Sequence, residues 1–333
     1  MNTEKLQQQL FAEIKKKIGE NGSVAEEIGK LLGISSDSAY RRMRGEKTIS
    51  LDELHILCRQ YKISLDRMMD IPTGGFLFHG NILDKKDYRF DAYMKGMVNA
   101  MAYMNSFAKK EFYSMCKDLL IFHQFHIREI AAFKWFFWIK TYYDFPEFAR
   151  KKFRFSDYDD DLFAMAQKSL AFYNQLPSVE LLSLEYMTSV FRQIEFFRDG
   201  NVFESDKDVY ILYEALEKLW DHLEKQAELG YKFSYGDPEQ KPISKLEMYF
   251  NEVLIGDNNM LVILDNVKIS YVAHTAINYM TTRDIVFNEN MFNHIQTQMK
   301  RSTLISGVSE KERSKFFRQI REKITRRKES LKI

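Results

Sequence analysis

Apolar residues in the first seventy positions recur every three or four residues, which is the spacing of amphipathic helices. Leu10 and Ile14 share such a face in the first segment. Ser23 and Ser50 stand where a side-chain oxygen caps the start of a helix, and Gly33 stands where a helix ends. The pattern predicts four or five short helices, the first four at 6–18, 24–32, 36–44 and 51–61.

In the rest of the chain, some segments have apolar residues at helical spacing and others have the short apolar runs typical of strands. Helical spacing recurs in seven segments, at 91–107, 126–143, 160–173, 179–197, 208–229, 288–301 and 309–329. An apolar run at 119–122 is compatible with a strand, and apolar runs around a polar turn at 256–259 predict a β-hairpin within 247–275. We expect a mainly α protein, in which a small helical domain precedes a larger, helix-rich α+β domain.

A short segment with Pro72 and the pair Gly74-Gly75 separates the two parts, because these residues are typical of turns and hinges. We therefore predict a first domain at 1–70, a linker at 71–90 and a second domain at 91–333.

Composition narrows the class of protein. Hydrophobic residues make up 45% of the chain and aromatic residues 14%, enough for a sizeable core. The two cysteines, Cys58 and Cys116, form no disulfide framework or thiolate metal site. The N-terminal residues lack the apolar core of a signal peptide, and no apolar run reaches the roughly 20 residues of a membrane span. We expect a cytoplasmic, soluble protein with no membrane partner.

The stretch from Ile28 to Asp66 resembles the phage-repressor class of helix-turn-helix domains, also called the Xre or Cro class. Gly29 holds the position where two helices cross, Gly33 the turn, and Ala39 the buried position of the next helix. Arg42 departs from the class, which usually has an apolar or aromatic residue there. The long region that follows is similar to that of Bacteroidota-type regulators.

The resemblance implies a recognition helix at 36–44 that enters the DNA major groove. The positions that read or adjoin base edges are Ser36, Asp37, Tyr40 and Arg41. The positions expected to contact phosphates are Ser38, Arg42, Arg44 and Lys47. Arginine makes the commonest specific contact, to guanine, and a carboxylate accepts from cytosine. The simpler alternative is that 35–38 only caps a helix whose arginines are a solvated face.

Motifs of catalysis are missing from the sequence. No glycine-rich phosphate loop and no G-x-S-x-G turn is present, so we expect no enzyme activity and no cofactor. His123 and His126 form an HxxH pair that suits a metal, but two histidines buried beside an aromatic core are commoner. The acidic cluster at 157–161 fits a helix N-terminus better than a metal site.

The basic C-terminal segment at 309–333 has two interpretations. It is either a docked terminal helix with a solvated basic face, or a second phosphate contact or dimerisation helix. The whole sequence favours a sequence-specific transcriptional regulator that binds double-stranded DNA as a homodimer, with room for a small-molecule effector. The alternative is a DNA-tethered interaction protein or enzyme, such as an antitoxin, phage-defence factor or nucleic-acid-processing enzyme.

Overall fold

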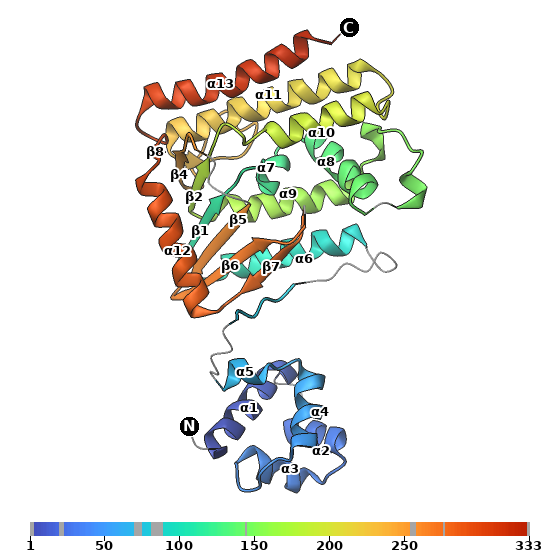
Figure 1. Ribbon diagram of the computed structural model, residues 1–333, viewed down its shortest axis with the longest axis vertical. Helices are drawn as coiled ribbons and strands as arrows, with labels where there is room; N and C mark the ends of the chain where they lie inside the picture. Colours follow the sequence, from blue (N-terminus) through green and yellow to red (C-terminus); the bar gives the residue numbers. More distant parts are fainter. Residues whose placement is uncertain are drawn as a thin grey trace. The chain divides into compact units, whose positions relative to one another are not determined.

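The chain divides into two compact units, Met1–Leu77 and Phe78–Ile333 (Figure 1). The computed structural model describes residues 3–19, 23–69, 75–80, 89–143, 145–253, 258–275 and 277–331. Most of the expected linker lies outside these residues. His79, from the same expected linker, forms an isolated backbone bridge with Thr281, so it belongs to the second unit.

The first unit consists of five helices around a small apolar core. They are α1 (Thr3–Ile18), α2 (Val24–Leu32), α3 (Ser36–Met43), α4 (Leu51–Tyr61) and α5 (Leu65–Met68). The core is formed by Leu10, Phe11, Ile14, Ala25, Ile28, Ala39, Leu57 and Tyr61. The helical spacing of the sequence therefore located α1 to α4, whereas the residues that α2 buries most deeply are Ala25, Ile28 and Gly29.

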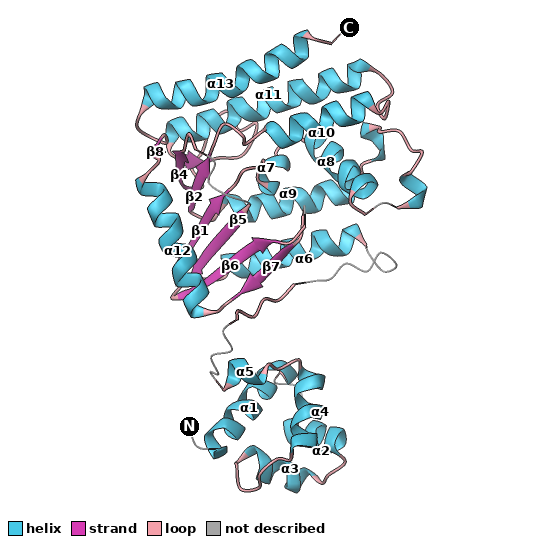
Figure 2. Ribbon diagram, in the orientation of Figure 1, coloured by secondary structure: helices cyan, strands magenta, loops and turns pink. Residues whose placement is uncertain are grey.

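The second unit is rich in helices and contains a mixed sheet of eight strands (Figure 2). Its helices are α6 (Phe90–Asn105), α7 (Ile121–Gln124), α8 (Arg128–Thr141), α9 (Asp160–Asn174), α10 (Thr188–Asp199), α11 (Asp206–Leu229), α12 (Ile285–Lys300) and α13 (Glu310–Glu329). Two 3₁₀ turns, Pro146–Phe148 and Phe155–Asp157, lie between α8 and α9.

The strands are β1 (Lys110–Met115), β2 (Ser178–Leu182), β3 (Tyr231–Lys232), β4 (Ser244–Phe250), β5 (Asn259–Leu264), β6 (Val267–Ala273), β7 (Tyr279–Thr282) and β8 (Thr303–Leu304). Their order is β3-β4-β2-β1-β5-β6-β7, and β8 pairs with β4. β1, β2 and β4 are parallel, and the other pairings are antiparallel. The parallel strands are joined by helical crossovers, as parallel pairing requires.

The two faces of the sheet are covered unequally. One face packs against a large aromatic core that includes residues of α6 to α11 and α13. The other face is covered by α12, through a small cluster that contains Tyr113, Leu181 and Ile295. Because Leu181 and Leu182 alternate between the two clusters, β2 is buried on both sides, as expected for a central parallel strand.

Three sequence-based predictions need correction. The run 119–122 is not a strand but leads into the short helix α7, and the strand is β1. The segment 179–197 is not one helix, because its first residues form β2. The expected hairpin exists, but it joins β5 and β6 through Asp265-Asn266 rather than through a turn at 256–259. β4 instead pairs with β2, a long-range contact that local pattern does not reveal.

Gly29 offers a test of the packing in the first unit. A Cβ atom at this position would lie 2.9 Å from the backbone oxygen of Ile34, so Gly29→Ala is expected to destabilise the first unit by about 1–3 kcal/mol. Gly96→Ala in α6 is the matched control, because a Cβ there meets nothing within 4 Å and alanine favours a helix. Urea unfolding, followed separately for each unit, measures the change in the free energy of unfolding that each variant causes. Equal changes for Gly29→Ala and Gly96→Ala would contradict the close packing of α2 against the turn.

Candidate functional site

A tight turn joins α2 to α3 in the first unit. Gly33 ends α2 in the left-handed conformation, with φ of 66°, and Ser35 caps α3 by accepting a hydrogen bond from the Ser38 N–H at 3.2 Å. The Ile34 N–H donates to the Gly29 oxygen at 2.9 Å, which brings the turn against α2. The absence of a side chain at Gly29 therefore sets the angle at which α3 leaves the turn.

The four residues expected at or beside base edges share the exposed side of α3. They are Ser36, Asp37, Tyr40 and Arg41, and all four are exposed. Tyr40 is 50% exposed, so half of its side chain faces solvent. Asp37, Tyr40 and Arg41 follow Ser36 by one, four and five positions. Because residues three or four positions apart are neighbours on a helix, the four side chains share one face. The opposite side of α3 contributes Ala39 to the core.

The residues expected to contact phosphates have three different environments. Arg44 and Lys47 are exposed, and Ser38 is half-buried. Glu46 forms an ion pair with Arg44 at 2.8 Å and a longer one with Arg41 at 3.8 Å. Exposed pairs of this kind contribute little free energy, so Glu46 does not prevent either arginine from meeting another anion.

Arg42 does not fit the phosphate role that the sequence suggested. Its side chain is only 6% exposed, and its guanidinium donates two hydrogen bonds to the Glu53 carboxylate, at 3.0 and 2.7 Å. A third bond joins Arg42 to the Ser38 oxygen at 3.1 Å. The hydrogen bond from Arg42 is the main reason that the pKa of Glu53 is lowered. Arg42 therefore forms a buried ion pair that joins α3 to α4.

Gln7 is a positioning residue that the sequence pattern did not reveal. It lies on the buried face of α1, and its Nε2 donates to the Arg42 and Lys47 oxygens, both at 2.7 Å. Its Oε1 accepts from the Ile49 N–H at 3.1 Å. Gln7 thus satisfies backbone groups on both sides of the loop after α3, which helix ends otherwise leave without partners. A buried glutamine among helical apolar positions is the signal that identifies it.

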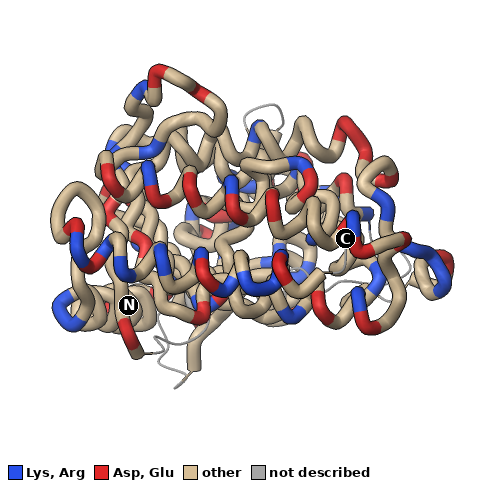
Figure 3. Tube along the Cα trace, turned by 90° about the horizontal axis from the view of Figure 1, so that it is seen from above, with Lys and Arg blue, Asp and Glu red and all other residues tan. Residues whose placement is uncertain are grey.

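The basic C-terminal segment is a helix docked on the second unit. Phe316, Phe317 and Ile320 of α13 are fully buried, and the Trp220 side chain of α11 donates to the Phe317 oxygen at 2.9 Å. Three of its cations pair with acids of neighbouring helices: Arg321 with Asp221, Arg327 with Glu195 and Lys328 with Glu217. Figure 3, which looks down on this layer, shows basic and acidic residues interleaved along the helices. This arrangement agrees with the simpler interpretation.

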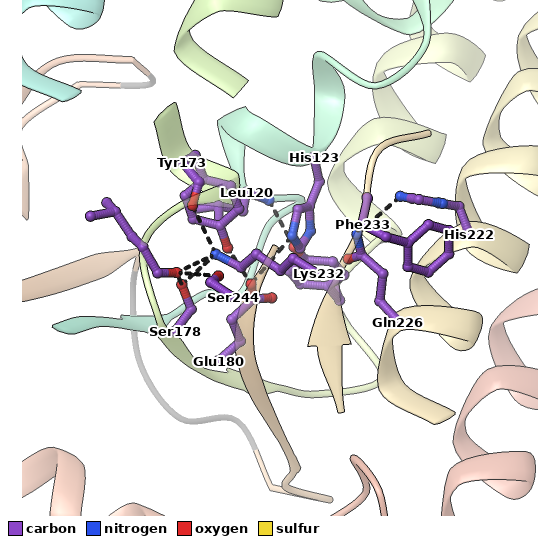
Figure 4. A network of polar contacts seen from close by, with 12 residues as sticks. Leu120, His123, Tyr173, Ser178, Glu180, His222, Gln226, Lys232, Phe233 and Ser244 are labelled. Carbon is purple, nitrogen blue, oxygen red and sulfur yellow. Dashed lines mark hydrogen bonds and ion pairs between the residues drawn. The ribbon is translucent and has the colours of Figure 1, made fainter. Parts of the chain in front are cut away.

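A buried lysine closes the end of α9 in the second unit (Figure 4). The Lys232 Nζ donates to the Tyr173 and Leu176 oxygens, at 3.1 and 3.0 Å, and to the Ser178 hydroxyl at 2.5 Å. Ser244 donates to the oxygens of Asn174 and Leu176 in the same turn. A cation suits the negative end of a helix dipole, so this group is a built-in C-terminal cap.

Next to Lys232 lies a buried carboxylate, Glu180. It accepts a hydrogen bond from the Tyr173 hydroxyl and lies 3.3 Å from the Nε2 atom of His123. The other ring nitrogen of His123 lies 2.8 Å from the Tyr186 hydroxyl. Burial raises the pKa of Glu180, but His123 and Lys232 outweigh it and the pKa is lowered overall. Glu180 is therefore held as a carboxylate among neutral and cationic partners.

The HxxH pair lies in the aromatic core of the second unit. His123 and His126 are both buried, and the His126 ring lies 4.6 Å from the His222 ring. Burial lowers the pKa of His126, and it lowers the pKa of His222 to about 4, so both rings are neutral at pH 7. Within the described residues, no group of three His, Cys, Asp or Glu is placed to hold a metal ion.

Comparison of the chain with protein-family models, with curated proteins and with solved structures finds no match. In the described part of the chain, none of the helices combines the length and apolar character needed to cross a membrane.

Removing the arginine of the buried pair is expected to destabilise the first unit. Arg42→Met leaves the Glu53 carboxylate partly buried without its partner, which costs about 3 kcal/mol. Arg42→Met/Glu53→Gln is expected to recover most of this loss, because glutamine keeps the cap at Ser50 without a charge. Urea unfolding measures the change, with the exposed Arg44→Met as control, for which we expect less than about 0.5 kcal/mol.

The same pair predicts a dependence on pH. The lowered pKa of Glu53 means that the pair stabilises the folded unit above the unfolded pKa of 4.5 and loses this effect as the pH falls through the folded pKa. The difference between wild type and Arg42→Met should therefore be largest near neutral pH and shrink in acid. A difference that is constant with pH would contradict the ion pair.

The buried lysine gives the second unit a response of the same sign, but at higher pH. Burial lowers the pKa of Lys232 to about 7, while Glu180 acts in the other direction. Because the unfolded chain binds a proton that the folded chain has lost, the free energy of unfolding should rise between about pH 7 and pH 9. Lys232→Met should reduce this rise, and the exposed Lys168→Met should not. An unchanged slope in Lys232→Met would show that Lys232 titrates normally.

Proposed function

We propose that the first unit is a helix-turn-helix module that recognises a DNA sequence through α3. The observation that carries the proposal is the convergence of Ser36, Asp37, Tyr40 and Arg41 on the exposed face of a helix that follows a tight turn. A short helix with small polar residues in its first turn can approach base edges closely in the major groove.

The chemistry of each side chain on and after α3 suits it either to base edges or to phosphates. Arg41 carries the planar donor pair that suits guanine, and Asp37 is an acceptor for the amine of cytosine. Arg44 and Lys47 follow α3, where exposed cations would hold phosphates and fix the position of the helix without reading sequence. Arg42 is left out of this set, because Glu53 already occupies its guanidinium.

The proposal includes a dimer, because one short recognition helix reads only a few base pairs. Two copies related by a two-fold axis would read half-sites about one helical turn apart. We assign the second unit the remaining roles of dimerisation and effector binding. Its basic helix α13 is not part of the proposed DNA contact, since Arg321, Arg327 and Lys328 pair with acids of α10 and α11.

Selection of bound duplexes from a random DNA pool tests the proposal. Wild type is expected to enrich a spaced two-fold motif, and Arg41→Ala should relax one position of each half-site at a cost of about 1–3 kcal/mol. Arg44→Ala should weaken binding to all sequences alike and reduce the salt dependence by about one phosphate contact.

Arg59→Ala is the control, because Arg59 is an exposed arginine that belongs to α4 and not to α3. It should leave both the motif and the affinity unchanged. If no motif is enriched, and Arg41→Ala and Arg59→Ala bind DNA with equal affinity, α3 is not a recognition helix.

A further inference from the structure

A cavity of about 110 Å³ lies in the second unit beyond the carboxyl end of β1. The segment that follows β1, together with α8 and α10, contributes to its walls. Four of its residues, Asp118, Tyr142, Ser189 and Gln193, also line a wider hollow of about 490 Å³. The cavity therefore adjoins a route from solvent, at the edge of a parallel strand pair where ligands commonly bind in α/β sheets.

The cavity contains a buried cation. Lys134 is 6% exposed, and its Nζ donates a hydrogen bond to the Gln193 Oε1 atom at 2.6 Å. Among the described residues it forms no ion pair with a carboxylate. Burial lowers the pKa of Lys134 to about 8, with Asp118 acting in the opposite direction, so the side chain is still charged at pH 7. A buried charge without a counter-ion is costly, and an anionic ligand would relieve that cost.

The same cavity also presents two hydrogen-bond acceptors, the side-chain oxygen of Gln124 and the carboxylate of Asp118. Gln124 is 4% exposed; its Nε2 donates to the Leu119 oxygen at 2.6 Å, which fixes the orientation of the amide. Its Oε1 finds no donor within the described part of the chain. The Asp118 carboxylate accepts one hydrogen bond, from the Asn258 side chain at 3.1 Å. A ligand that fits must therefore combine a negative group with a hydrogen-bond donor.

The remaining walls combine apolar and polar side chains. The apolar ones include Ile121, Trp138 and Ile277, which are all buried, and the polar ones include Ser189 and Asn258. A cavity of about 150 Å³ holds benzene, so a volume of about 110 Å³ suits a ligand with no more non-hydrogen atoms than benzene, about six at most. This size matches an α-amino acid with a short apolar side chain.

We propose that this cavity binds a small zwitterionic α-amino acid, whose carboxylate accepts from Lys134 and whose ammonium donates to Gln124 and Asp118. Charges of both signs in one small cavity select a molecule that carries both, because a ligand with one charge leaves the group of the other sign without a partner. The inference stands on the second unit alone and does not depend on DNA recognition by α3.

Binding of alanine to the full chain tests this inference, by ligand-observed NMR and by the fluorescence of the tryptophans. Propionate lacks the ammonium group and ethylamine lacks the carboxylate, so each is expected to bind at least about tenfold more weakly than alanine. Propionate binding as tightly as alanine would overturn the zwitterion assignment. Saturable binding of none of the three compounds would overturn the site.

Two variants separate the charges. Lys134→Met should weaken alanine and propionate alike, by at least about tenfold. Asp118→Asn keeps the size of the side chain and should weaken alanine while leaving propionate unchanged. Lys168→Met, an exposed lysine of α9, is the matched control and should bind alanine as wild type does. If Lys134→Met does not fold, Asp118→Asn alone tests the proposal. An equal loss of affinity for alanine and for propionate in Asp118→Asn would contradict it.

Discussion

The ion pair between Arg42 and Glu53 is the interaction on which the exposed face of α3 depends. It joins α3 to α4 through two hydrogen bonds, while Glu53 also completes the cap at Ser50. One carboxylate thus fixes both the start of α4 and the rotation of α3 about its axis. With Arg42 turned inward, Arg41 and Tyr40 are directed outward, because neighbouring positions on a helix point about 100° apart.

The same constraint, that a buried charge must have partners, organises the second unit. Lys232 meets it by capping α9, and Glu180 meets it with His123 and Tyr173. Lys134 meets it only in part, with one neutral amide and the face of the Trp138 ring, whose centre lies 5.4 Å from its Nζ atom. The difference separates a group that stabilises the fold from one that is available to a ligand. Buried cations with complete sets of acceptors are structural, whereas an incomplete set is a feature of a binding site.

Local pattern predicted the helices well, and it predicted strand pairing poorly. Capping residues and helical spacing located α1 to α4 and most helices of the second unit, because these signals act within a few residues. β2 was assigned to a helix, since Glu180 interrupts an apolar run that otherwise reads as a buried strand. Only the tertiary structure supplies the His123 and Tyr173 side chains that allow a carboxylate in that strand.

For the candidate sites, the sequence by itself determined that Ser36, Asp37, Tyr40 and Arg41 recur on one helical face, because their spacing is a local property. It did not determine the role of Arg42, whose partner Glu53 lies eleven positions away on another helix. The cavity around Lys134 could not be predicted from the sequence either, because its walls come from the segment after β1, from α8 and from α10. Burial and partners are long-range properties, and they alone decided which charges hold the fold together and which remain available for binding.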